Sequence, residues 1–148
     1  MNRRAILLFS CALVLPARAA GASGLPPIEV YRDPGCSCCE GWAAHLQEAG
    51  FAVTMNDDFE RRARRLALGI ADELASCHTA MVDDLVIEGH VPASDIVRLL
   101  ANRPAGAYGL AVPEMPAGSP GMGPEGSGPP YVTLLLARDA APSVFAQH

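Results

Sequence analysis

The sequence predicts an α/β fold, because strand-like and helix-like segments alternate along one short chain. Three observations support this prediction. The chain has 148 residues, a length typical of a single domain. Half of the residues are hydrophobic, so a core can form and wholesale disorder is excluded. Short apolar runs of strand composition are separated by segments in which apolar residues recur at helical spacing.

Composition also excludes two classes of function. The chain carries 11 Lys and Arg residues against 16 Asp and Glu residues, a net charge of −5. This acidic balance argues against a nucleic-acid-binding protein, which needs a basic surface. The sequence contains no apolar run of about 18 residues or more, so we expect no membrane span.

The first 19 residues have the pattern of a secretory signal peptide. Asn2-Arg3-Arg4 is a positive start, the apolar run Ala5 to Leu15 is too short to span a bilayer, and Ala17-Arg18-Ala19 is typical of a cleavage site. A lipobox at Cys11 and a twin-arginine signal at Arg3-Arg4 match less well. We therefore expect export to an oxidising compartment, the bacterial periplasm.

Cleavage would change the mature chain in two ways. It removes three arginines, which leaves eight basic residues against 16 acidic ones and a net charge of −8. It also removes Cys11, so that four cysteines remain: Cys36, Cys38, Cys39 and Cys77. Exposed thiols in an oxidising compartment are expected to form disulfides, to be redox-active or to bind metal.

Residues 28–103 are predicted to alternate between strands and helices. Gly50 ends the first helix, Asp57 and Asp58 cap the second, and Asp83-Asp84 separates two strands of a hairpin. Pro92 opens the third helix and Pro104 closes it. The predicted strands are 28–31, 51–55, 79–82 and 85–87, and the predicted helices are 38–47, 57–70 and 92–103. The order β-α-β-α-β-β-α is that of a thioredoxin-like domain.

The composition changes after the third predicted helix. Residues 104–130 contain seven glycines and seven prolines, and we expect no regular element there. Strand-like runs return at 131–136 and at 144–146. We therefore predict a thioredoxin-like domain over 28–103 and a Gly/Pro-rich C-terminal extension over 104–148 that returns as strands. Because the chain returns to ordered structure, the loop is expected to fold over the cysteine site and contribute to it, rather than to be a free linker.

The cysteines lie where a strand turns into a helix. Cys36 and Cys39 form a C-x-x-C pair, and the helix N-terminus favours the thiolate form of such cysteines. This pair is the candidate catalytic site of a thiol–disulfide oxidoreductase, with Cys36 as the attacking thiolate and Cys39 as the resolving thiol. Cys38 adds a third sulfur that a dithiol mechanism does not need.

Cys77 precedes the third predicted strand, at the junction that faces the C-x-x-C turn in a thioredoxin-like fold. Four sulfurs are therefore expected to converge. Neighbouring cysteines such as Cys38 and Cys39 fit the usual ligand spacing of zinc poorly. The side chains of neighbouring residues diverge, so two adjacent cysteines would bind one tetrahedral ion only with strain. Thiolates select Cu(I), and thiolates that bridge several soft ions would remove this strain. Copper binding, metal-free redox chemistry, zinc binding and structural disulfides all stay open at this point.

Further candidate metal ligands are His78, which adjoins Cys77, and Met115 and Met122, which lie in the Gly/Pro-rich loop. The alternative for the two methionines is a hydrophobic contact that holds the loop to the domain. His45 is expected at the surface, and His90 is expected to cap or orient a turn.

Five segments of the sequence resemble the CopG-like copper-resistance proteins, a family long described as a domain of unknown function. The segments are YRDPGCSCCEGWAAHL, ELASCHTA, VIEGHVPASDI, GLAVPEMPAGSPGM and SVFAQH. The resemblance implies a periplasmic thioredoxin-like domain with an extension that helps to bind metal. It also implies a cysteine-bridged polynuclear copper cluster and a role in Cu(I)/Cu(II) interconversion.

Three functional hypotheses follow. The first is a periplasmic copper-binding oxidoreductase with Cys36, Cys38, Cys39 and Cys77 as ligands, a monomer that acts with a periplasmic copper efflux system. The second is the thiol–disulfide oxidoreductase described above. The third is a copper scavenger or chaperone without catalytic activity.

Overall fold

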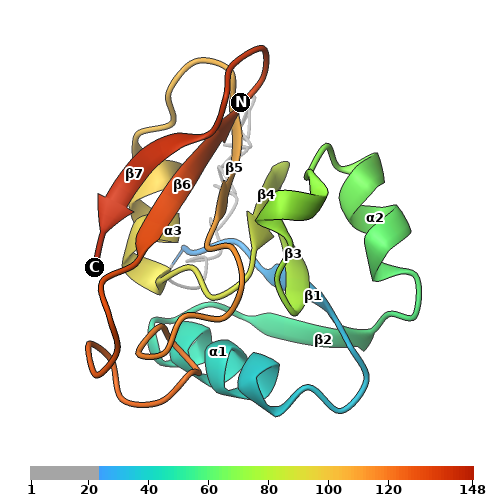
Figure 1. Ribbon diagram of the computed structural model, residues 1–148, viewed down its shortest axis with the longest axis vertical. Coiled ribbons are helices and arrows are strands. Elements are labelled where there is room, and N and C mark those ends of the chain that lie inside the picture. The colour runs from blue at the N-terminus through green and yellow to red at the C-terminus, as the bar shows by residue number, and fades with distance from the viewer. Residues whose placement is uncertain (1–23) are drawn as a thin grey trace, which may run out of the picture.

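The computed structural model describes residues 24–148, so the predicted signal peptide lies outside the described residues. These residues form one mixed seven-stranded sheet in the order β2-β1-β3-β4-β5-β6-β7. In the same part of the chain, three helices and one 3-10 turn pack on this sheet (Figure 1). The helices are α1 (Ser37–Glu48), α2 (Arg61–Ala67) and α3 (Ala93–Ala101), and the 3-10 turn is η1 (Asp72–Leu74). The strands are β1 (Ile28–Arg32), β2 (Val53–Asp57), β3 (His78–Val82), β4 (Leu85–Glu88), β5 (Ala107–Ala111), β6 (Val132–Ala137) and β7 (Ser143–Gln147).

The prediction of a mixed α/β fold is confirmed. The strands β1 and β2 are parallel and are joined through α1, as a crossover helix requires. β3 pairs antiparallel with both β1 and β4, with Asp83 at positive φ in the β3–β4 turn. α2 is shorter than predicted because the chain turns at Gly69 and continues into η1.

The expectation that residues 104–130 lack a regular element is wrong for β5. This strand runs parallel to β4 and antiparallel to β6, so it lies inside the sheet. Gly109 allows the close approach, because a Cβ atom there would lie 2.1 Å from the carbonyl oxygen of Val86. The glycine that suggested a loop is therefore the residue that lets this strand pair.

Two apolar clusters hold the layers together. The larger one joins α1 and α3 to one face of the sheet, and its central side chain is the fully buried Trp42. The smaller one lies on the other face, where Ile70 and Leu74 pack against Val86 and Leu136. The indole Nε1 of Trp42 donates a hydrogen bond to the carbonyl oxygen of Val91, 2.8 Å away, which ties α1 to the segment before α3.

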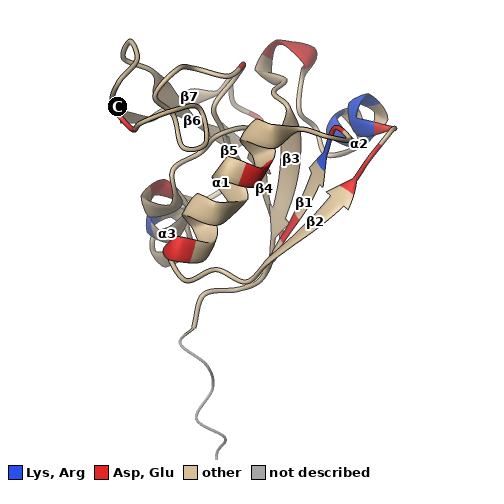
Figure 2. Cartoon of the chain, turned by 90° about the horizontal axis from the view of Figure 1, so that it is seen from below, with Lys and Arg blue, Asp and Glu red and all other residues tan. Residues whose placement is uncertain are grey.

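The arginines of α2 lie at one end of the molecule (Figure 2). All four form ion pairs: Arg61 with Asp33, Arg62 with Asp72, Arg64 with Asp58 and Arg65 with the buried Glu88. Within residues 24–148, no helix is long and apolar enough to cross a membrane.

Candidate metal centre

The turn from β1 to α1 presents the first three cysteines. Cys36 is the N-cap of α1, and its Sγ accepts a hydrogen bond from the backbone N–H of Cys39 at 3.3 Å. Cys38 is half-buried, whereas Cys39 is fully buried on the inner side of the helix. Arg32 braces the turn from β1, since its guanidinium donates to Glu40 and to Asp57. The site is therefore built on the start of a helix that the core holds in place.

Cys77 reaches the same place from the start of β3. The backbone N–H of Asp33 donates to the carbonyl oxygen of Cys77 at 3.5 Å, which joins the two segments. Glu88 supports Cys77 from inside the sheet: its buried carboxylate accepts from the N–H of Ser76 at 2.8 Å and from the hydroxyl of Thr79 at 2.5 Å. Burial raises the pKa of Glu88.

The four sulfurs lie in one compact group. Cys36 and Cys39 form a disulfide, while Cys38 and Cys77 are free thiols. The Sγ of Cys38 lies 3.4 Å from that of Cys36 and 3.7 Å from that of Cys77. The Sγ of Cys77 lies 3.5 Å from that of Cys39. Metal–thiolate bonds are near 2.3 Å, so sulfurs about 4 Å apart are within the reach of a shared ion.

Two histidines extend this group. The Sγ of Cys77 lies 3.3 Å from Nδ1 of His78 and 3.0 Å from Nε2 of His90. Ligand atoms of Cys77, His78 and His90 all lie within 4.8 Å of one another, and so do those of the four cysteines. Cys77 belongs to both sets, which makes it the centre of a sulfur and imidazole cluster.

Burial sets the protonation states of the cluster. It lowers the pKa of His78 to about 3, with a further contribution from neighbouring His90, and it also lowers the pKa of His90. Both imidazoles are therefore neutral at pH 7 and keep a lone pair. Burial and the Cys38 thiol raise the pKa of Cys77 to about 12. A metal ion that binds Cys77 must therefore displace its proton.

The donor set fits a soft metal ion. Thiolate sulfur and neutral imidazole nitrogen are ligands of Cu(I), whereas Mg²⁺ and Ca²⁺ select oxygen. The buried Nε2 of His78 has no hydrogen-bond partner among the residues that the structure describes. All four cysteines can act as thiolates only after the Cys36–Cys39 disulfide has accepted two electrons.

The Gly/Pro-rich loop lies against this cluster. The carbonyl oxygen of Pro120 lies 2.7 Å from Nδ1 of His90, which therefore donates to it. Gly121 packs on α1 so closely that a Cβ atom there would lie 2.6 Å from the carbonyl oxygen of Cys38. Ser76 is also in contact with the loop, through its hydroxyl and the carbonyl oxygen of Glu114.

The structure brings one of the other predicted ligands, His78, to the cluster, where it is grouped with Cys77 and His90. Met122 is half-buried and directly follows Gly121, whereas Met115 is half exposed. Coordination by either thioether stays a prediction.

The sequence reasoning missed His90 as a site residue. It lies 13 residues beyond Cys77, but the hairpin of β3 and β4 returns the chain to the cluster. The segment VIEGHVP contained a signal, because a histidine that follows a buried strand of a hairpin lies level with the start of the partner strand. His45 was expected at the surface, but it is half-buried between α3 and the loop.

Comparisons with known proteins show which family this chain is similar to. Residues 74–122, which include Cys77, His78 and His90, match a family described as a protein of unknown function, DUF411. A search of curated proteins found no significant match. Two solved structures of copper resistance protein CopG resemble the chain over most of its length. Form 1 is 39% identical with a TM-score of 0.78, and the match covers 84% of this chain and 98% of that one. Form 2 is 40% identical with a TM-score of 0.77, covering 83% and 98%. The chain therefore belongs to the CopG copper resistance protein family.

Proposed function

We propose that this protein binds copper ions, as its substrate, at the cysteine and histidine cluster and interconverts Cu(I) and Cu(II) in the periplasm. The observation that carries the proposal is the position of Cys77, whose Sγ lies within 3.7 Å of Cys38, Cys39, His78 and His90. One thiolate with so many ligand neighbours is suited to bridging two ions. The predicted signal peptide and the copper resistance proteins to which the chain is similar support the periplasmic role.

The cluster favours more than one copper ion. Two overlapping sets of ligand atoms share Cys77. Adjacent residues such as Cys38 and Cys39 also match the usual ligand spacing of a single tetrahedral ion poorly. Sulfur and nitrogen donors together suit both oxidation states, because thiolate selects Cu(I) and imidazole also binds Cu(II). The surrounding buried groups limit access of water, which tunes the redox potential of a bound metal.

We place this site on a thioredoxin-like core formed by residues 28–103, with 104–148 as the extension. The support is the strand order β2-β1-β3-β4, with β1 and β2 parallel and β3 antiparallel to both of its neighbours. β5, β6 and β7 then continue the same sheet. The loop between β5 and β6 supplies Pro120 and Gly121 at the cluster.

A second candidate function is thiol–disulfide exchange, and the Cys36–Cys39 disulfide favours it. Cys36 is the more exposed cysteine of the pair. In the disulfide it would be the sulfur that a substrate thiolate attacks, and in the reduced protein it would be the thiolate that attacks a substrate disulfide. The buried Cys39 would be the resolving thiol. A copper scavenger or chaperone without turnover is the third candidate. Copper efflux proteins of the periplasm would be partners of either copper function.

The Cys38→Ser variant separates the two main functions. We expect its affinity for Cu(I) to fall by at least about tenfold, since one ligand of the cluster is lost. Reduction of a disulfide substrate such as insulin should stay within about twofold of the parent, because the Cys36–Cys39 pair is intact. Copper content and insulin reduction, each measured on anaerobically reduced protein, provide the test. Equal copper affinity in variant and parent would refute copper binding at this cluster.

A further inference from the structure

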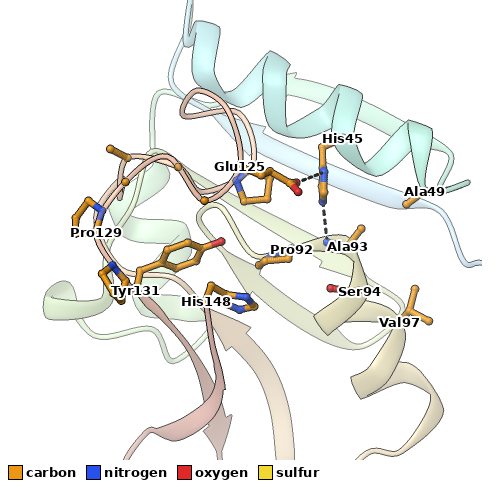
Figure 3. Close-up of a pocket in the computed structure, with 16 residues that line it drawn as sticks. His45, Ala49, Pro92, Ala93, Ser94, Val97, Glu125, Pro129, Tyr131 and His148 are labelled. Atoms are coloured by element: carbon orange, nitrogen blue, oxygen red, sulfur yellow. Dashed lines mark hydrogen bonds and ion pairs between the residues drawn. The ribbon is translucent and has the colours of Figure 1, made fainter.

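A cavity of about 840 Å³ lies beside the metal centre, and none of the four cysteines lines it (Figure 3). It opens between the C-terminal half of α1, the start of α3, the loop before β6 and the end of β7. Its apolar walls are the rings of Pro92, Pro120, Pro129, Pro130 and Tyr131. Cavities of this size with apolar walls and a few polar groups are typical of small-molecule sites.

His148 is the polar group on which the inference rests. It lines the cavity, and its Nε2 lies 2.9 Å from Oδ2 of the buried Asp95 and 3.1 Å from the hydroxyl of Thr133. A carboxylate only accepts hydrogen bonds, so Nε2 carries a proton, and in the neutral imidazole Nδ1 then keeps its lone pair. Within residues 24–148, Nδ1 has no hydrogen-bond partner. A histidine oriented in this way by a buried carboxylate is a strong hydrogen-bond acceptor.

His45, on the opposite wall, has no lone pair to offer (Figure 3). Its Nε2 accepts the backbone N–H of Ala93 at 3.0 Å, so Nδ1 carries the proton and donates to Glu125 at 3.1 Å. A metal ion at Nδ1 would require loss of that proton. The second oxygen of Glu125 and Nδ1 of His148 are therefore acceptors on the cavity wall, beside the hydroxyl groups of Ser94 and Tyr131. They favour a ligand that donates hydrogen bonds and disfavour an anion.

The walls of the cavity favour a ligand with a planar ring. Tyr131 stacks on His148 with ring centroids 4.8 Å apart and an interplanar angle of 27°. The flat faces of Pro92 and Pro129 border the same space, and aromatic ligands pack well against such surfaces (Figure 3).

The cavity also has a short connection to the cluster. Pro120 lines it, and the carbonyl oxygen of Pro120 accepts a hydrogen bond from His90, which in turn contacts Cys77. A ligand in the cavity is thus separated from the cluster by one loop residue and one imidazole.

We propose that this cavity binds a small diphenol of the hydroquinone class, whose hydroxyl donates to Nδ1 of His148 while its ring packs against Tyr131 and the prolines. The redox consequence rests on the proposed copper function. One hydroquinone loses two electrons and two protons and becomes a quinone, while two Cu(II) ions at the cluster become two Cu(I) ions. His148 takes one proton, and the Glu125 carboxylate takes the other on its way to water.

Binding is tested on the copper-free protein, so that failure of the copper function leaves the test intact. Hydroquinone titrated into the labelled protein should shift NMR signals of Tyr131 and His148 saturably. His148→Phe should weaken binding by about five- to tenfold, because the hydrogen bond to Nδ1 of His148 is lost. 1,4-Dimethoxybenzene, which has the ring but no hydroxyl donor, should bind the parent protein more weakly by a similar factor.

Tyr108→Leu is the matched control, because Tyr108 lines a separate hollow of about 420 Å³ near β5 and should leave the affinity unchanged within twofold. If His148→Phe does not fold, Asp95→Asn is the second variant. The NMR shifts of the parent protein test binding without any variant. Absence of saturable shifts, or equal affinity for hydroquinone and its dimethyl ether, would overturn the proposal. Binding to copper-free protein without quinone formation by the Cu(II)-loaded protein would refute only the redox step.

Discussion

Replacing Cys77 by serine should remove most of the copper that the reduced protein retains. The Sγ of Cys77 lies 3.0 to 3.7 Å from ligand atoms of Cys38, Cys39, His78 and His90, so its loss affects both halves of the cluster. Serine oxygen is a hard and weakly acidic donor that does not replace a thiolate on Cu(I). We expect a loss of Cu(I) affinity of at least about 100-fold, measured by competition with a Cu(I) chelator.

Ser37→Ala is the control for this experiment, because Ser37 lies in the same motif but its side chain is exposed. Thermal unfolding of both variants shows whether the serine at position 77 has disturbed the core. A folded Cys77→Ser variant with the copper affinity of the parent would contradict the assignment of Cys77 as the shared ligand.

Substituting Gly121 by alanine should loosen the loop that lies on the cluster. A Cβ atom at this position would lie 2.6 Å from the carbonyl oxygen of Cys38 and 2.6 Å from the backbone nitrogen of Trp42, and the residue has a φ of +85°. We expect the left-handed backbone to cost about 1–2 kcal/mol. In addition, the clash of the new Cβ atom with the backbone of α1 should displace the loop from this helix. Copper should consequently be lost to a chelator several times faster than from the parent.

Gly126→Ala separates these two effects. Gly126 has a similar φ of +71°, but a Cβ atom there would meet no atom within 4 Å. Its substitution should therefore cost only the backbone strain and leave the rate of copper loss unchanged. Equal rates of copper loss in the two variants would show that the loop does not control access to the cluster. Deleting residues 104–148 is a poorer test, because it would also remove β5, β6 and β7.

The sequence was informative wherever local chemistry decides the structure. The three cysteines follow a strand and begin a helix, as the spacing of Cys36, Cys38 and Cys39 and the apolar positions after them predicted. The two predicted strands of the C-terminal segment also appear, as β6 and β7. These features depend on periodicity and on turn residues, which a single sequence records.

Features that depend on tertiary contacts were missed. β5 contains Gly109, a residue type that by sequence alone indicates a turn. Its role depends on the close approach of the carbonyl oxygen of Val86 on the neighbouring strand. His90 is separated from Cys77 by a hairpin, and only the pairing of β3 with β4 brings the two together. His45 is half-buried because the loop carries Glu125 to it, and loop position is set by packing rather than by local sequence.

X-ray absorption at the copper edge of the reduced, copper-loaded protein tests the central claim most directly. We predict a first shell dominated by sulfur at about 2.3 Å, the length of metal–thiolate bonds, with a smaller nitrogen contribution from imidazole. A second shell of copper would identify bridging thiolates. A first shell of nitrogen and oxygen alone would place the metal away from Cys36, Cys38, Cys39 and Cys77 and would contradict the account.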